Sequence, residues 1–173
     1  MLERSYGTEL DNILTDIQWN FSTLNIGGYY VLAHHKDVVS VGVDPSVQIG
    51  LSFPAGPGVN IMVQTPVYLM ARVGANSTPY NQQALGLSVG VGGNLQYLTF
   101  TGLNRRTTFF APGAVVEGTL SSRGAPLTFR LHFSPAQPQT LFKYTGPDNG
   151  TSTNVDVNYR FSSILGFGLL YGF

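Results

Sequence analysis

The residues of this chain that could carry acid–base or ionic chemistry are few, and seven of them lie where apolar and polar side chains alternate. The 173 residues include nine basic residues, nine acidic residues, three histidines and no cysteine. Successive side chains of a β-strand point to opposite faces, so alternation assigns each charged residue to a face. One set falls on the face opposite the apolar one: Asp44, Arg72, Glu117, Arg130, His132, Asp156 and Arg160. Glu117 belongs to this set if Val116 and Leu120 face the other way.

Acids and bases that share one face can neutralise one another. Charges inside a narrow barrel have to be paired, because an isolated buried charge is very costly. The set therefore predicts a polar network that fills the barrel interior. The alternative is a narrow path for small solutes lined by the same residues, although eight strands usually leave no continuous channel.

Other chemistry finds little support in the residue pattern. The absence of cysteine excludes disulfides, thiolate metal sites and cysteine nucleophiles. His34 and His35 fall in a polar turn, where neighbouring side chains on an extended chain point apart. Phosphate-binding loops, zinc-ligand spacings and nucleophile elbows are also missing from the sequence. We therefore predict no enzymatic activity, no catalytic residue, no metal site and no cofactor.

The strands that must position the charged residues are marked by a period of two. The cleanest runs from residue 38 to 53, and similar stretches cover residues 59–73, 85–97 and 127–133. Residues 107–121 alternate less clearly, because Phe109 and Phe110 are adjacent. Residues 25–28 interrupt an earlier stretch, either as a tight hairpin or as a glycine kink in one strand. A hairpin gives eight strands and a kink gives seven; we take eight, since single-chain bacterial barrels have an even number.

The last stretch, Val155 to Phe173, is predicted as one long strand with an almost wholly apolar and aromatic face. That length exceeds the usual five or six residues of a soluble strand. Its final odd positions are apolar or aromatic: Leu165, Phe167, Leu169, Tyr171 and Phe173. This pattern resembles the closing strand of a Gram-negative outer-membrane β-barrel, whose assembly signature is an aromatic last residue preceded by apolar residues at alternate positions.

The resemblance implies an all-β, antiparallel, up-and-down transmembrane β-barrel, similar in architecture to the eight-stranded OmpA/OmpX type. We assign residues 1–15 to an N-terminal segment with a short helix signal from Thr8 to Ile17, and residues 16–173 to the barrel. Charged residues make up only 10% of the chain while 43% are hydrophobic, as expected if hydrocarbon surrounds the barrel. Aromatic residues near strand ends would form the interfacial girdle on the outer side: Phe53, Tyr97, Phe100, Phe109, Tyr144, Tyr159 and Phe161.

Two other families of small membrane barrels, both acting on lipids, were compared with the sequence. Lipid A deacylases use a histidine, a serine and an acid on the outer wall, whereas His132 has inward parity. Palmitoyl-transferring barrels hold an acyl chain in an apolar interior, and the interior predicted here is polar. Neither resemblance holds.

The functional expectation is a non-enzymatic, structural or accessory component of the bacterial outer membrane, in its mature form after signal-peptide removal. Its expected partners are the lipid bilayer, the outer-membrane assembly machinery and other outer-membrane proteins. A net charge of zero argues against a nucleic-acid partner. The alternatives are a narrow porin-like channel and a soluble β-sandwich or jelly-roll shell or binding subunit.

Overall fold

The structure, a computed structural model, describes residues 2–6, 15–17, 22–52, 59–101, 105–122, 125–135, 140–147, 154–161 and 163–171. Within these ranges the chain forms twelve β-strands, and every pairing between them is antiparallel. The described part contains no helix long and apolar enough to cross a membrane.

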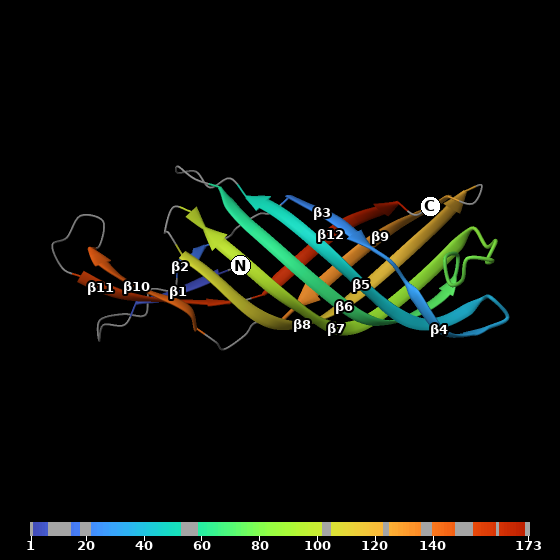
Figure 1. Cartoon of the computed structure of the whole chain (residues 1–173), viewed down its shortest axis with the longest axis horizontal. Coiled ribbons are helices and arrows are strands. Elements are labelled where there is room, and N and C mark those ends of the chain that lie inside the picture. The colour runs from blue at the N-terminus through green and yellow to red at the C-terminus, as the bar shows by residue number, and fades with distance from the viewer. Residues whose placement is uncertain are drawn as a thin grey trace.

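The main sheet has eight strands and curls into a half-barrel (Figure 1). Its order is β12-β9-β8-β7-β6-β5-β3, with β4 also paired to β5. The strands are β3 (Ser22–Gly27), β4 (Tyr30–His35), β5 (Val39–Ser52), β6 (Asn60–Gly74), β7 (Leu85–Phe100), β8 (Arg105–Ser122), β9 (Ala125–Ser134) and β12 (Ile164–Tyr171). The prediction of an all-β, antiparallel architecture is confirmed, and the main sheet has eight strands when β3 and β4 are counted separately.

The first two strands of this sheet differ from the expected hairpin. β3 and β4 both pair with β5, end to end along one edge, and their register is the same on both sides of the interruption: Ile26 faces Val47, and Tyr30 faces Val43. Gly28 donates a backbone hydrogen bond to the carbonyl of Pro45 (3.2 Å), but Pro45 has no amide hydrogen to return one. The hairpin prediction was wrong, and the kink interpretation is the one observed.

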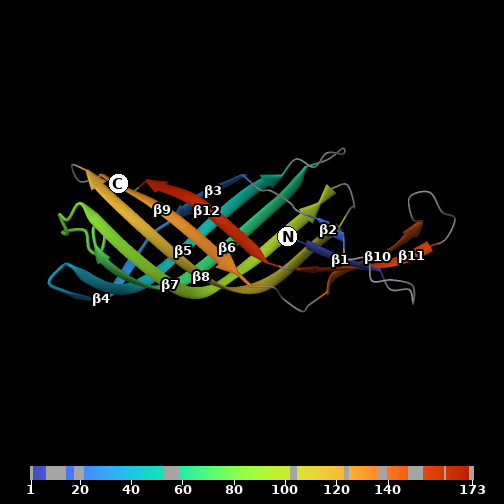
Figure 2. The ribbon, with the colours of Figure 1, turned by 180° about the vertical axis from the view of Figure 1, so that it is seen from behind.

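The remaining strands form a second sheet of order β10-β11-β1-β2. They are β1 (Leu2–Tyr6), β2 (Thr15–Ile17), β10 (Thr140–Pro147) and β11 (Asn154–Phe161). Figures 1 and 2 show these strands extending beyond one end of the main sheet. Their side chains lie outside the described part of the chain.

Two expectations fail in this second sheet. Residues 15–17 form a strand, which agrees with a β-region that begins at residue 16 and not with a helix signal that reaches Ile17; residues 8–14 of that signal lie outside the described residues. The stretch predicted as one strand from residue 155 is divided into β11 and β12, which belong to different sheets. Residues 2–6, expected to precede the barrel, pair with both β11 and β2.

The two faces of the main sheet are sharply different in composition. Apolar side chains cover the convex face and are exposed, whereas the concave face is lined by buried polar and charged residues. Alternation along the strands sets this division; on β9, for example, Leu131 is 51% exposed and Arg130 only 6%. The predicted outward position of Phe109 was wrong: Phe109 is buried and Phe110 is the exposed residue.

Candidate functional site

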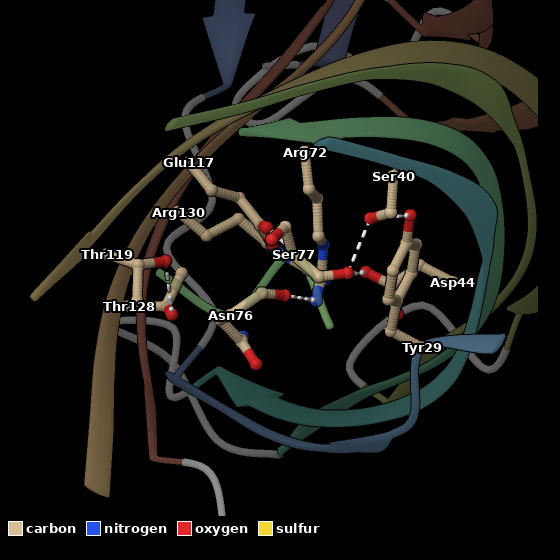
Figure 3. Close-up of polar contacts among 10 residues, drawn as sticks. All are labelled: Tyr29, Ser40, Asp44, Arg72, Asn76, Ser77, Glu117, Thr119, Thr128 and Arg130. Atoms are coloured by element: carbon tan, nitrogen blue, oxygen red, sulfur yellow. Dashed lines mark hydrogen bonds and ion pairs between the residues drawn. The ribbon is translucent and has the colours of Figure 1, made fainter. Parts of the chain in front are cut away.

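A cluster of four charged side chains lies on the concave face, with its members contributed by β5, β6, β8 and β9 (Figure 3). Arg130 donates from Nε to Glu117 Oε1 (2.6 Å) and bonds Asp44 through Nη2. Arg72 Nη2 lies 3.4 Å from Glu117 Oε2 and 3.7 Å from Asp44 Oδ2. Two guanidinium groups and two carboxylates thus balance one another.

The register of the sheet explains why these residues meet. Three of them lie in one ladder row, meaning residues directly paired across neighbouring strands. The row reads Ser40, Arg72, Ser88, Glu117, Arg130 and Gly168. The small side chain of Ser88 lies between Arg72 and Glu117, which leaves room for the long arginine to cross β7. A Cβ at Gly90, two residues further along β7, would press against the side chains of Met70 and Val115, which would have to shift to admit it.

The loop between β6 and β7 covers one end of this cluster. Ser77 is completely buried, its carbonyl accepts a hydrogen bond from Ser40 Oγ (2.5 Å), and its own hydroxyl donates to the Asp37 carbonyl (2.8 Å). Arg72 Nη1 donates to the Asn76 carbonyl (3.5 Å), and Figure 3 shows both loop residues inside the curl of the sheet.

Tyr29 completes the environment of Arg72. The Arg72 guanidinium lies 3.8 Å above the Tyr29 ring, a cation–π contact. The Tyr29 hydroxyl forms a hydrogen bond with Ser40 Oγ (3.0 Å). Tyr29 was not predicted as a site residue, although it has the same parity as Gly27 and Val31, both of which face inward partners on β5.

A second inward-facing ladder row lies further along the same strands and carries no charge. It consists of four carboxamides: Asn25, Gln48, Gln64 and Gln96. Gln64 Oε1 accepts a hydrogen bond from Asn94 Nδ2 (2.9 Å). Neither amide atom of Gln96 has a hydrogen-bond partner within the described part of the chain, although the side chain is fully buried. This half of the interior is polar without being ionic.

His132 lies beside the cluster and not within it. Its Nε2 is 3.3 Å from Ser134 Oγ, and its ring meets Tyr68 edge-on with centroids 6.2 Å apart. A serine this close to a histidine is the spacing of a nucleophile and its base. Ser134 is 0% exposed, however, so a substrate cannot approach its hydroxyl.

The other predicted network residues are not brought to the cluster. Asp156 and Arg160 lie on β11 in the second sheet, where Arg160 pairs with Glu3 and Thr140. Four of the seven predicted residues therefore form one contact network, His132 is a neighbour, and two lie elsewhere.

The polar turn before β5 has a side-chain contact of its own. His34 Nδ1 lies 3.2 Å from Asp37 Oδ1, and both side chains are about half exposed. The described ranges contain no group of three or more acidic, histidine or cysteine side chains that could hold a metal ion.

The apolar signature of the last strand faces outward. Leu165, Phe167, Leu169 and Tyr171 are each exposed by more than half, while Gly166 and Gly168 occupy the concave side. Phe173 lies outside the described residues.

Comparison of the chain with protein-family models, with curated protein sequences and with solved structures found no match. The arrangement of side chains on the two faces of the curled sheet is therefore the basis for a functional assignment.

Proposed function

We propose that the chain is an integral outer-membrane β-barrel whose interior is plugged by the ionic cluster, with a structural or accessory role. The observation that carries this proposal is the inverted distribution of side chains: exposed leucine, valine and phenylalanine outside, and buried arginine, aspartate and glutamate inside. Soluble monomers rarely expose continuous apolar patches larger than a few hundred Å². In a bilayer the same face is surrounded by hydrocarbon and needs no further cover.

The strand directions support a closed barrel. The strands alternate in direction from β3 across to β12, so the two edges of the main sheet run the same way. Two edge strands that run in the same direction can be joined by one additional strand that is antiparallel to both. β1 meets this requirement, because it is antiparallel to β11, which precedes β12 in the chain, and to β2, which precedes β3.

Successive pairing partners also lead around a ring. They run from Thr23 through Gly50, Met62 and Leu98 to Thr107, and then from Thr140 through Arg160 and Glu3 to Asp16. Continuing the β8–β9 register, in which Ala114 faces Phe133, places Thr107 opposite Thr140. The path starts at Thr23 on β3 and ends at Asp16 on β2, about seven positions earlier in the chain, and a stagger of this kind is required when tilted strands close into a barrel.

The ionic cluster favours a plug over a pore. Its four charges neutralise one another, and the β6–β7 loop is folded against them. We therefore expect the barrel to conduct little or no current, and we assign it an accessory role in the outer membrane, alone or as a subunit of a larger complex.

Heat-modifiable migration on a detergent gel after refolding into micelles tests this proposal. We expect the refolded chain to migrate differently before and after boiling, and planar bilayers containing it to show no steady conductance. A steady current through the unmodified protein that vanishes in Arg130→Met would contradict the plug and support the narrow channel. Stable solubility at high concentration without detergent would support the soluble shell or binding subunit and contradict the membrane barrel.

A further inference from the structure

The two edges of the main sheet, β3 and β12, each pair with a strand on one side only. β3 pairs with β5 and β12 with β9, and no second strand is paired with either edge within the described part of the chain. β1 lies in the line between these edges, because it pairs with β11, which precedes β12, and with β2, which precedes β3. β1 covers only Leu2–Tyr6, so beside β3 and beside residues 164–170 of β12 no described strand uses the second row of backbone hydrogen-bonding groups.

Side chains on both edges are more exposed than the residues directly paired with them. Ile26 on β3 is 72% exposed and its partner Val47 only 47%, while Phe167 on β12 is 69% exposed and its partner Leu131 only 51%. All four side chains lie on the convex face, so the face does not account for the difference. The missing neighbour accounts for it, because a strand inside a sheet is flanked by side chains from both sides.

The concave side of β12 has space for side chains from a neighbouring strand. Gly166 and Gly168 occupy this side. A Cβ at Gly168 would meet no atom within 4 Å, and the three atoms nearest to a Cβ at Gly166 all belong to the His132 side chain. At Gly92, on β7 in the middle of the sheet, a Cβ would instead collide with the backbone of Val67. The edge therefore has room that the middle of the sheet lacks.

The directions of the two edges determine which strand fits between them. β3 and β12 run the same way, so one strand between them is antiparallel to both. β3 and β4 lie end to end along β5, so the main sheet is seven strands wide. One added strand makes eight, and single-chain bacterial barrels have an even number of strands.

We propose that β3 and β12 form an acceptor site for one extended strand of a partner protein, which continues the line of β1 and pairs antiparallel with both edges. The inference rests on the proposed membrane barrel, because open sheet edges do not occur within the hydrocarbon region of a bilayer. An extended segment is the occupant that fits, since a row of backbone donors and acceptors is satisfied by the addition of another strand. A second copy of the chain, paired through β12 against β12, would cover one edge and leave β3 open.

The convex side of the acceptor site specifies the side chains of the added segment. Leu24 and Ile26 on β3, and Leu165 and Phe167 on β12, are exposed there, so the residues that lie between them are apolar. A pocket of about 300 Å³ at the junction of β3 and β4, lined by Ile26 and Tyr30 among others, has room for one such side chain. The partner segment therefore carries apolar residues at alternate positions along the eight residues of β12.

Disulfide capture of a synthetic strand tests the acceptor site in phosphatidylcholine vesicles. The probe is a peptide with the sequence of β9, which already pairs antiparallel with β12, carrying cysteine in place of Leu131. Since the chain has no native cysteine, single cysteines are introduced on the convex face: Phe167→Cys and Ile26→Cys at the two edges, and Val89→Cys in the middle of the sheet. We expect each edge variant to form at least about five times more peptide adduct than Val89→Cys, because only an edge offers backbone groups to the peptide.

A backbone-methylated peptide is the matched control. Methyl groups on successive backbone nitrogens remove the amide hydrogens that face both edges and leave every side chain in place. We expect this peptide to react with the two edge variants no more than with Val89→Cys. The unmethylated peptide without cysteine should also raise the urea midpoint of the cysteine-free chain, since a ligand that binds only the folded state stabilises it.

Three outcomes would overturn the acceptor site. The first is equal capture at the edges and at Val89→Cys, or equal capture of the methylated peptide. The second is a disulfide between Ile26→Cys and Phe167→Cys within one chain, formed without peptide, because the two edges would then already meet. The third is a covalent dimer of Phe167→Cys that the peptide does not suppress, which would replace the partner protein with a second copy.

Failure of the membrane barrel gives a different result. Rapid labelling of Val89→Cys by a membrane-impermeant maleimide in intact vesicles would contradict the proposed function itself, whatever the peptide does. Protection of Val89→Cys together with capture at neither edge would retain the membrane barrel and overturn the acceptor site alone.

Discussion

The two halves of the concave face of the main sheet are built on the same strands but differ in charge. In the half that lies toward β4, two arginines and two carboxylates neutralise one another across β5 to β9. On the other side a ladder row of carboxamides occupies the equivalent inward positions. The alternation of side chains along the strands places both sets on the inward face. The residue type then decides whether an inward side chain forms ionic contacts with neighbouring strands.

The largest effect should come from breaking the charge balance of the cluster. Arg130→Met leaves Glu117 and Asp44 with one guanidinium between them, and removing one partner of a buried pair costs about 3–5 kcal/mol. Urea unfolding in lipid vesicles would measure this loss. The double variant Glu117→Gln, Arg130→Met should lose less, because Asp44 and Arg72 still balance. A double variant that loses as much as the two singles combined would contradict mutual neutralisation.

A charge placed on the outer face should have the next largest effect. Leu131→Arg introduces a guanidinium on the face that we assign to lipid, one residue along β9 from the inward-facing Arg130. An arginine at the bilayer midplane costs about 2–4 kcal/mol in membrane barrels. Leu131→Val is the control and should cost much less. In a soluble protein the half-exposed Leu131 would accept arginine with little change in the unfolding free energy, so a neutral result would contradict the assignment of this face.

Interrupting β1 should have a smaller effect on stability but a clear effect on closure. Arg4 pairs with Tyr159 on one side and Thr15 on the other. Arg4→Pro removes an amide hydrogen from this strand, and a lost backbone partner costs about 1–3 kcal/mol. We expect less of the heat-modifiable form on detergent gels, with Arg4→Ala as the control. Equal behaviour of the two variants would show that β1 does not close the barrel.

The carboxamide row should be the least sensitive. Gln96 is fully buried, and neither of its amide atoms has a hydrogen-bond partner among the described residues. Gln96→Leu replaces it with an apolar side chain of similar size and should change the unfolding free energy by less than about 1.5 kcal/mol. A loss as large as that of Arg130→Met would remove the distinction between the two halves.

Much of this architecture could be predicted from the sequence, because period-two alternation determines the face of each residue. The inward positions of Asp44, Arg72 and Arg130 follow from it directly. Phe109 was misassigned because two adjacent phenylalanines fit either parity, and only the register with β7 decides between them.

The features that were missed depend on long-range pairing. β1 is only five residues long and carries no clear alternation, so its role is visible only through its partners β11 and β2. The division between β11 and β12 has a similar cause, since β11 pairs with β10 and β1 whereas β12 pairs with β9. Ser77 enters the cluster through a loop conformation that alternation does not describe.

Labelling of single cysteines with a membrane-impermeant maleimide tests the central claim most directly, because the chain has no native cysteine. Leu131→Cys and Leu169→Cys lie on the face assigned to lipid. In refolded vesicles both should stay unlabelled, and both should react once the vesicles are dissolved and the chain is unfolded. Rapid labelling of either cysteine in intact vesicles would show that the apolar face meets water, and would contradict the account.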